Sequence, residues 1–208
     1  MKNKVDNEQL ILEAAEREFL DKGFKNASTT AIAERAGVTQ AMVHYYYRTK
    51  EKLFNKVFQI KVLKAAGSFE AALCDSGIFE DVIRNFIEKH FDFVAENPQL
   101  MNFVYNEITS NADSRKLVLE VMEPKVKPIL GHLAKLIDDE VKKGTIRQIK
   151  IIDLMMNIAS INLISVMALP MMKELIPNQP DEVYVNFLKE RKESNVQFIL
   201  NALKVLKK

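Results

Sequence analysis

Apolar residues recur every three or four positions along most of the chain, a spacing that predicts helices and not strands. Residues 7–22 place their apolar side chains on one stripe with Glu and Arg opposite, as in an amphipathic helix. Gly23 ends that pattern, and Phe24 is expected to pack back on the last turn. A second, shorter helix follows Ser28, a good N-cap, and carries Ile32 and Ala36 on one face.

The next segment changes direction and then exposes polar residues. Gly37 stands where a chain leaving a helix commonly needs positive φ, and Thr39 can cap a third helix. That helix turns Met42 or Val43 inward. Its outward positions are Gln40, Ala41, His44, Tyr45 and Tyr46. Two short helices, a turn with glycine and an exposed polar second helix are typical of the DNA-binding helix-turn-helix.

The same stretch carries a family resemblance. From Ser28 onward the residues fit S-T-T-x-I-A-x-x-A-G-V-T-x-x-x-V-x-Y-Y-Y-x-T-K-E-x-L-F. With the preceding helix that ends in Gly-aromatic, residues 10–57 resemble the DNA-binding domain of the TetR family of bacterial transcriptional regulators. The chain departs from the family pattern at His44, where Tyr is usual, and at Tyr46, where His is common.

The chemistry of the exposed residues suits a DNA duplex. Gln40 can offer a donor and an acceptor to adenine, and Ala41 can contact the thymine methyl group. Tyr45 and Thr30 can reach a base or sugar. The phosphate candidates are Ser28, Thr29, Thr39, His44, Tyr46 and Lys50. The resemblance places DNA contacts at Thr29, Thr30, Gln40, Ala41, His44, Tyr45, Tyr46 and Lys50, and it leaves Tyr47 as a core aromatic.

The rest of the chain reads as further helices, so the expected fold is all-α. We expect a helix-turn-helix DNA-binding domain over residues 1–55 and a helical ligand-sensing and dimerisation domain over residues 56–208. Asn97-Pro98 predicts a helix start, with Asn97 as N-cap, and Pro124 and Pro128 predict a kink or break in a long helix. The last two helices, each pairing with its copy, are expected to form a four-helix homodimer interface, as the resemblance also implies.

Residues 151–172 are the most apolar segment and raise the alternative of a membrane helix, because a spanning helix needs ~20 apolar residues. Polar residues within the segment, Asp153 and Asn157 among them, favour a helix buried between its own core and a second subunit. The N-terminus lacks the apolar region of a secretory signal, and the lone Cys74 excludes an intrachain disulfide. We therefore expect a cytoplasmic protein that does not act at a membrane.

Composition narrows the chemistry further. The net charge of +2 indicates no partner by itself, and we find no catalytic motif, no cofactor motif and no multi-cysteine metal site. Soft and aromatic side chains in the second half predict an adaptable apolar pocket for a hydrophobic or amphipathic effector. Its candidate residues are Phe86, His90, Phe93, Met101, Tyr105, Asn106, Met122, Met155 and Asn162.

Taken together, these patterns predict a transcriptional regulator that acts as a homodimer on a palindromic DNA operator under the control of a small molecule. The expected effect of operator binding is repression. Two alternatives from other classes remain. One is a helical interaction module without DNA binding, and the other is an interfacial membrane protein that uses residues 151–172.

Overall fold

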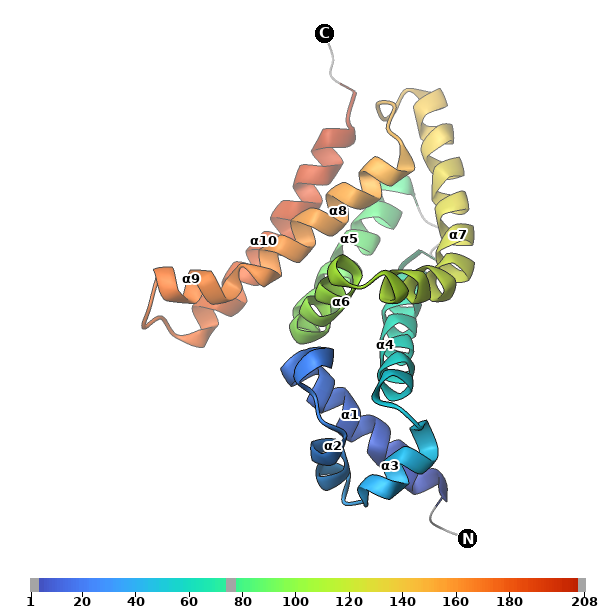
Figure 1. Cartoon of the computed structure of the whole chain (residues 1–208). Helices are drawn as coiled ribbons and strands as arrows, with labels where there is room; N and C mark the ends of the chain where they lie inside the picture. The colour runs from blue at the N-terminus through green and yellow to red at the C-terminus, as the bar shows by residue number, and fades with distance from the viewer. Residues whose placement is uncertain (1–3, 74–77, 206–208) are drawn as a thin grey trace. The chain divides into compact units, whose positions relative to one another are not determined.

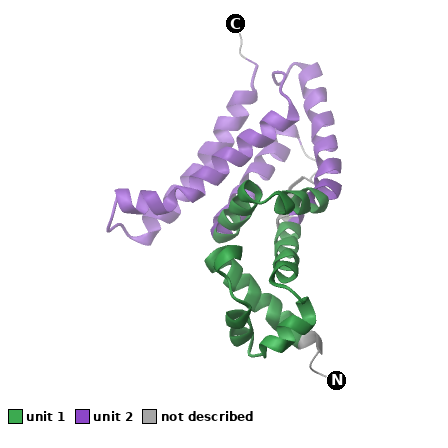
Figure 2. Ribbon diagram, in the orientation of Figure 1, with its two compact units in different colours: residues 1–64, 99–121 green, residues 65–98, 122–208 purple. Residues whose placement is uncertain are grey.

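The computed structural model describes residues 4–73 and 78–205, and nearly all of these residues are helical. Cys74 lies outside the described residues, as do residues 75–77, whose sequence Asp-Ser-Gly predicts a helix break, and the apolar Leu206. The chain divides into two compact units, the first made of residues 1–64 and 99–121 and the second of residues 65–98 and 122–208 (Figure 2). Each unit therefore combines segments that are distant in the sequence.

The first unit begins with three helices and the start of a fourth: α1 (Lys4–Asn26), α2 (Thr29–Ala36), α3 (Gln40–Tyr47) and α4 (Lys50–Leu73) (Figure 1). Gly23 interrupts α1 with φ 70° and ψ 171°, so the predicted helix end is confirmed at that residue. Beyond the kink, the Phe24 ring lies 6.5 Å from the ring of Phe19. The chain thus folds back on the helix it has just left, as the sequence predicted.

Capping side chains set the helix starts of this unit. Ser28 Oγ accepts from the Thr30 N–H at 3.2 Å, and Thr39 Oγ1 accepts from the Met42 N–H at 3.3 Å. Thr49 Oγ1 accepts from the Lys52 N–H at the start of α4. Between α2 and α3, Gly37 is left-handed with φ 67° and ψ 29°. The caps Ser28 and Thr39 and the turn at Gly37, predicted from the sequence, are therefore confirmed, each by a hydrogen bond or dihedral angle that the residue type favours.

An aromatic cluster centred on Phe54 forms the core of the first unit. Its ring lies 5.2 Å from Phe19, 4.9 Å from Phe24, 5.7 Å from Phe58 and 5.5 Å from Phe103. Phe103 belongs to α6 (Pro98–Ser110), which packs in this unit although it lies 40 residues or more from the others in sequence. The helices α1 to α3 and the start of α4, called the head below, are thus stabilised by a helix that was expected in the second domain.

The second unit is built around three helices that pack against one another: α5 (Phe79–Glu96), α8 (Ile151–Met167) and α10 (Asp181–Leu203) (Figure 1). The later part of α7 (Ala112–Lys143) completes it. An isolated bridge joins Ile146 to Lys204 just after α10. The buried core of this unit consists of Phe79, Val82, Ile83, Phe86, Ile87, Leu133, Ile137, Ile146, Leu154, Ile158, Val196, Ile199, Leu200 and Leu203.

Helix α7 continues through both Pro124 and Pro128 without a break, and the division between units falls just before them, after Val121. One local expectation differs from the structure. Asn97 caps the end of α5, donating from Nδ2 to the Phe93 carbonyl at 2.8 Å, and does not cap α6. Pro98 does open α6, where its missing N–H costs nothing.

The apolar segment 151–172 forms two helices and not one, because Pro170 starts α9 (Leu169–Leu175) directly after α8. The two helices meet at a bend of 43°. Within the described residues no single helix has the length and apolar character needed to cross a membrane; α8 and α9 reach them only when counted together across the bend.

Candidate nucleic-acid interface

Helix α3 separates a buried face from an exposed one. Val43 and Tyr47 are 2% and 8% exposed and belong to the core. Gln40, Ala41 and His44 are exposed, and Tyr45 is 67% exposed despite its large ring. An aromatic side chain left in water forgoes the gain of burial, which makes this face a candidate contact surface. Met42 is half-buried between the two faces.

The hydroxyl groups predicted to contact phosphates keep a donor available. Ser28 and Thr39 use their oxygens to accept from backbone N–H groups, as described above, so each O–H hydrogen can still be donated outward. Thr30 is exposed on the first turn of α2. Gln40 Nε2 donates to Thr29 Oγ1 at 3.4 Å, which links α3 to α2. Thr29 therefore lies where it can orient the amide of Gln40.

The three consecutive tyrosines have different surroundings. Tyr45 and Tyr46 meet edge to face, with ring centroids 5.4 Å apart. Tyr47 donates from its hydroxyl to Glu8 Oε1 at 3.1 Å. Burial, and then the nearby Glu8 carboxylate, raise the pKa of Tyr47 well above its usual range. Tyr47 thus ties α3 to α1 as a neutral core residue, in agreement with the sequence prediction.

Two of the predicted phosphate contacts already have partners inside the protein. Lys50 Nζ donates to the carbonyl of Ala27 at 3.0 Å and to that of Lys25 at 3.4 Å, and it lies 4.6 Å from the centre of the Phe24 ring. His44 Nδ1 lies 2.9 Å from the carbonyl oxygen of Arg48. Because that oxygen can only accept, His44 Nδ1 carries the hydrogen. Neither interaction was expected from the sequence.

Glu18 is a buried carboxylate that the sequence analysis missed. It is fully buried beneath α2, where its Oε1 accepts from Lys22 Nζ at 2.8 Å and from the Ser28 N–H at 3.4 Å. Arg35, at the other end of α2, lies 3.5 Å from Oε2. The hydrogen bond from Lys22 is the main cause that lowers the pKa of Glu18. Its spacing of seven residues from Ile11 puts it on the apolar stripe of α1, which was the available signal.

The nine candidate pocket residues fall in both units. Met101, Tyr105 and Asn106 lie in the first unit, where Tyr105 and Asn106 are exposed. The other six lie in the second unit, where Phe86 and Phe93 are buried and Met155 packs against the core. Among these residues, the rings of Phe86 and His90 are 6.2 Å apart, and Asn162 contacts His90. Phe86, His90 and Asn162 therefore share one location.

A directional chain of hydrogen bonds runs between α10, α8 and α5. Arg191 Nη2 donates to Asn195 Oδ1 at 2.9 Å, and Asn195 Nδ2 donates to Asn162 Oδ1 at 2.9 Å. Asn162 Nδ2 then donates to the Ile87 carbonyl at 2.9 Å and faces His90 Nδ1 at 3.1 Å. Because a guanidinium can only donate, it fixes the orientation of both amides and makes His90 Nδ1 an acceptor. Burial lowers the pKa of His90 to about 4, so this ring is neutral at neutral pH.

Of these network residues, Asn195 and Arg191 were not predicted. Asn195 is 1% exposed and lies beside the core residues Val196 and Ile199, so its position on the apolar stripe of α10 was the available signal. Asn157, a polar residue of the apolar segment 151–172, is exposed.

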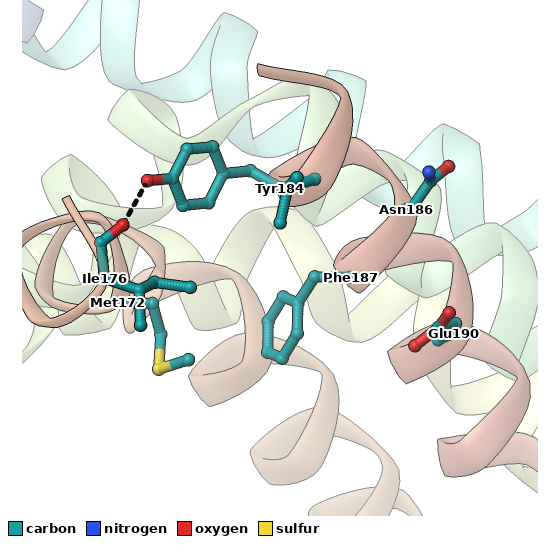
Figure 3. A pocket seen from close by; sticks show the side chains of 7 residues that line it. Met172, Ile176, Tyr184, Asn186, Phe187 and Glu190 are labelled. Carbon is teal, nitrogen blue, oxygen red and sulfur yellow. Dashed lines mark hydrogen bonds between the residues drawn. The ribbon is translucent and has the colours of Figure 1, made fainter. Parts of the chain in front are cut away.

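An open cavity of about 320 Å³ lies between α9 and α10, separate from the nine candidates (Figure 3). At its edge Tyr184 donates from its hydroxyl to the Ile176 carbonyl at 2.9 Å, which closes the loop between the two helices. Lys173 Nζ lies 4.8 Å from the centre of the Tyr184 ring. The lining residues are Met172, Ile176, Val183, Tyr184, Asn186, Phe187 and Glu190.

Comparison with known proteins agrees with this geometry. Residues 11–57 match the family model for bacterial regulatory proteins of the tetR family, and residues 80–199 match the tetracyclin repressor-like C-terminal domain. The chain is 26% identical over 144 residues to the uncharacterized HTH-type transcriptional regulator YhgD of Bacillus subtilis, covering 69% of this chain and 73% of that one. It is 24% identical over 146 residues to the fatty acid metabolism regulator protein of the same organism, covering 69% and 75%.

Among solved structures, the transcriptional regulator FadR from Bacillus subtilis in complex with stearoyl-CoA superposes with a TM-score of 0.65 at 18% identity, covering 94% of this chain and 99% of that one. The all-α fold and the helix-turn-helix predicted from the sequence are thereby confirmed. Members of this family are DNA-binding regulators of transcription and not enzymes. With both its N-terminal and C-terminal models matched, the chain belongs to the TetR family of bacterial transcriptional regulators.

Proposed function

We propose that this regulator binds a near-palindromic operator as a homodimer, with α3 in the major groove of each half-site. The observation that carries the proposal is the composition of the exposed face of α3, where Gln40, Ala41 and Tyr45 stand opposite the buried Val43 and Tyr47. The groove is ~12 Å wide and admits one helix whose N-terminal residues meet the base edges. Gln40 and Ala41 are the first two residues of α3.

Base reading is assigned to Gln40, Ala41, Tyr45 and Thr30. The amide of Gln40 has a second N–H and a carbonyl beyond its bond to Thr29, the pair that adenine requires. Backbone contacts are assigned to the hydroxyl groups on and beside α2 and α3. These are Ser28, Thr29, Thr39 and Tyr46.

We further propose that α8 and α10 form the dimer interface. Ile152, Met156 and Ile164 repeat at multiples of four along α8 and are 56%, 59% and 63% exposed, which defines one apolar stripe. On α10, Phe198 is 64% exposed. Exposed apolar residues on two helices that already pack together are typical of a subunit interface.

The effector is proposed to be a molecule with a long acyl chain. The support is the relative named a fatty acid metabolism regulator and the similar fold that binds stearoyl-CoA. Apolar side chains such as Phe86 suit the acyl chain, and the His90 ring, which Asn162 holds by a hydrogen bond, offers a polar group at the same place. Binding there changes the regulator's affinity for DNA only if the two DNA-binding conformations bind the effector differently.

Selection of bound duplexes from a random DNA pool tests the operator. The expected result is a palindromic consensus whose half-site centres are roughly 34–36 Å apart or a multiple of that. Enrichment of no sequence over the starting pool would contradict the proposal. The affinity for the selected duplex should then fall with salt less steeply than the slope of ~−10 known for a strongly cationic repressor, because the head carries few cations.

The dimer interface is tested by Ile164→Glu, with Leu119→Glu as matched control because Leu119 is equally exposed (65%) but lies on α7. Light scattering should show a monomer for the first variant and an unchanged dimer for the second. If both variants remain dimers, the interface does not involve this face of α8.

The effector is tested with stearoyl-CoA and with the free fatty acid of the same length. An increase in melting temperature and a change in affinity for the selected duplex are expected for wild type and for Asn157→Ala, and both effects should weaken in Asn162→Ala. Asn157 is the control because it is an exposed asparagine on the same helix. The proposal fails if neither compound alters melting temperature or DNA affinity.

A further inference from the structure

Arg48, the single residue between α3 and Thr49, has an unusual backbone conformation. Its φ of 56° and ψ of −50° are positive-φ values for a residue that has a Cβ. The Thr49 N–H donates to the Tyr47 carbonyl across it. Arg48 is thus the centre of a γ-turn with positive φ, the rare and strained form of this turn. Glycine would adopt the same turn at lower cost, so the presence of arginine requires a reason.

His44 holds both backbone groups of Arg48. The Arg48 N–H donates to the His44 carbonyl at 2.9 Å, and His44 Nδ1 donates to the Arg48 carbonyl at 2.9 Å. His44 lies on the exposed face of α3, one turn before Arg48. The orientation of the turn is therefore fixed to the recognition helix itself, and the Arg48 side chain leaves the protein from a defined place.

Of the two positively charged side chains beside this turn, Lys50 contacts other parts of the protein and Arg48 extends into solvent. Lys50 Nζ is engaged with the carbonyls of Ala27 and Lys25 and with the Phe24 ring, which ties the start of α4 to the end of α1. The Arg48 side chain is exposed, and no carboxylate of residues 4–73 or 78–205 lies within ion-pair distance of its guanidinium. A planar guanidinium that no described carboxylate engages is suited to two oxygens of a phosphodiester.

We propose that Arg48 contacts a DNA phosphate, and that His44 is a positioning residue that holds the turn from which Arg48 reaches it. In this arrangement Lys50 supports the structure of the head, and Arg48 supplies the charge that the sequence analysis had assigned to Lys50. The inference rests on the proposed binding of α3 in the major groove, because that placement brings the end of α3 beside the DNA backbone.

Arg48→Gly is the sharpest test, because it removes the guanidinium while glycine accepts the positive φ. The melting temperature should stay the same or rise. The affinity should fall by about ten-fold per head, for the selected duplex and for a scrambled duplex of the same length alike. The salt slope of binding should become shallower by about 0.9 per head. Lys56→Ala is the matched control, since it removes one exposed positive charge six residues into α4 and should leave the slope nearly unchanged.

The role of His44 is tested by His44→Phe, alone and in the Arg48→Gly background. The single variant should weaken DNA binding, while the same change should add little once the Arg48 side chain is gone, because both act through one contact. Full additivity of the two losses would assign His44 a contact of its own and overturn its positioning role.

An unchanged salt slope in Arg48→Gly would overturn the assignment of Arg48. If Lys50→Met made the slope shallower in its place, the phosphate contact would belong to Lys50. Failure of the proposed function is a separate outcome, seen in the wild-type protein as equal affinity for the selected and the scrambled duplex.

Discussion

The buried histidine of the second unit makes stability depend on pH in a specific range. His90 has a pKa of about 4 in the folded protein because burial disfavours its charged form, against an ordinary value of 6.5. The folded pKa lies below the unfolded one, so the unfolded chain binds the proton more readily. The contribution of His90 to stability is therefore complete above pH 6.5 and is lost as the pH falls towards 4.

The size of the effect follows from these two values. Between about pH 7.5 and about pH 5, the unfolding free energy should decrease by ~2 kcal/mol through His90 alone. The hydrogen-bond chain also predicts a loss of stability at low pH. The Asn162 amide donates to His90 Nδ1, so protonation of Nδ1 would place two donors against each other. Asn162 cannot simply reverse, since Asn195 and Arg191 fix its orientation.

The assay is urea denaturation of wild type and His90→Gln at a series of pH values. Glutamine retains an acceptor for Asn162 but does not titrate. Carboxylates with lowered pKa, such as Glu18, act equally in both proteins and cancel in the difference. The difference between the two curves should shrink by ~2 kcal/mol from about pH 7.5 to about pH 5. Parallel curves over the whole range would refute the assignment of His90 as a buried neutral acceptor.

Three further predictions concern the DNA-binding head. Gly37→Ala should destabilise the protein by about 1 kcal/mol in chemical denaturation, purely through its φ of 67°, because an added Cβ meets nothing within 4 Å; an unchanged midpoint would contradict this. Thr39→Ala should cost about 1 kcal/mol by removing the cap of α3, whereas Thr39→Ser should restore it. Phe54→Ala should cost ~3–5 kcal/mol, because Phe54 contacts four other rings; a loss below about 1 kcal/mol would show that the cluster closes around the gap.

The local structure of the head was predictable because its signals are local. Gly37 and the caps Ser28 and Thr39 act within four residues of themselves, so residue type and spacing determine them. The packing of Phe103 on Phe54 was not predictable, since the two are 49 residues apart and no local preference links them. The same holds for Asn195 and Asn162, whose pairing depends on how α8 and α10 pack.

The candidate DNA interface was likewise predictable only where its signals are local. Sequence placed Gln40, Ala41 and Tyr45 on an exposed helix face, and the structure agrees. The partners of Lys50 and the strained turn at Arg48 follow from the way α1 ends and α4 begins, which periodicity does not describe. A residue with positive φ that is not glycine gives no signal in the sequence.

The run of tyrosines in α3 has a spectroscopic consequence. The protein has no tryptophan and five tyrosines, and three of those five are Tyr45, Tyr46 and Tyr47. Three of the five tyrosine rings therefore lie in one eight-residue helix, and those of Tyr45 and Tyr46 are in edge-to-face contact. Any change in the tyrosine emission of this protein is thus weighted towards the recognition helix.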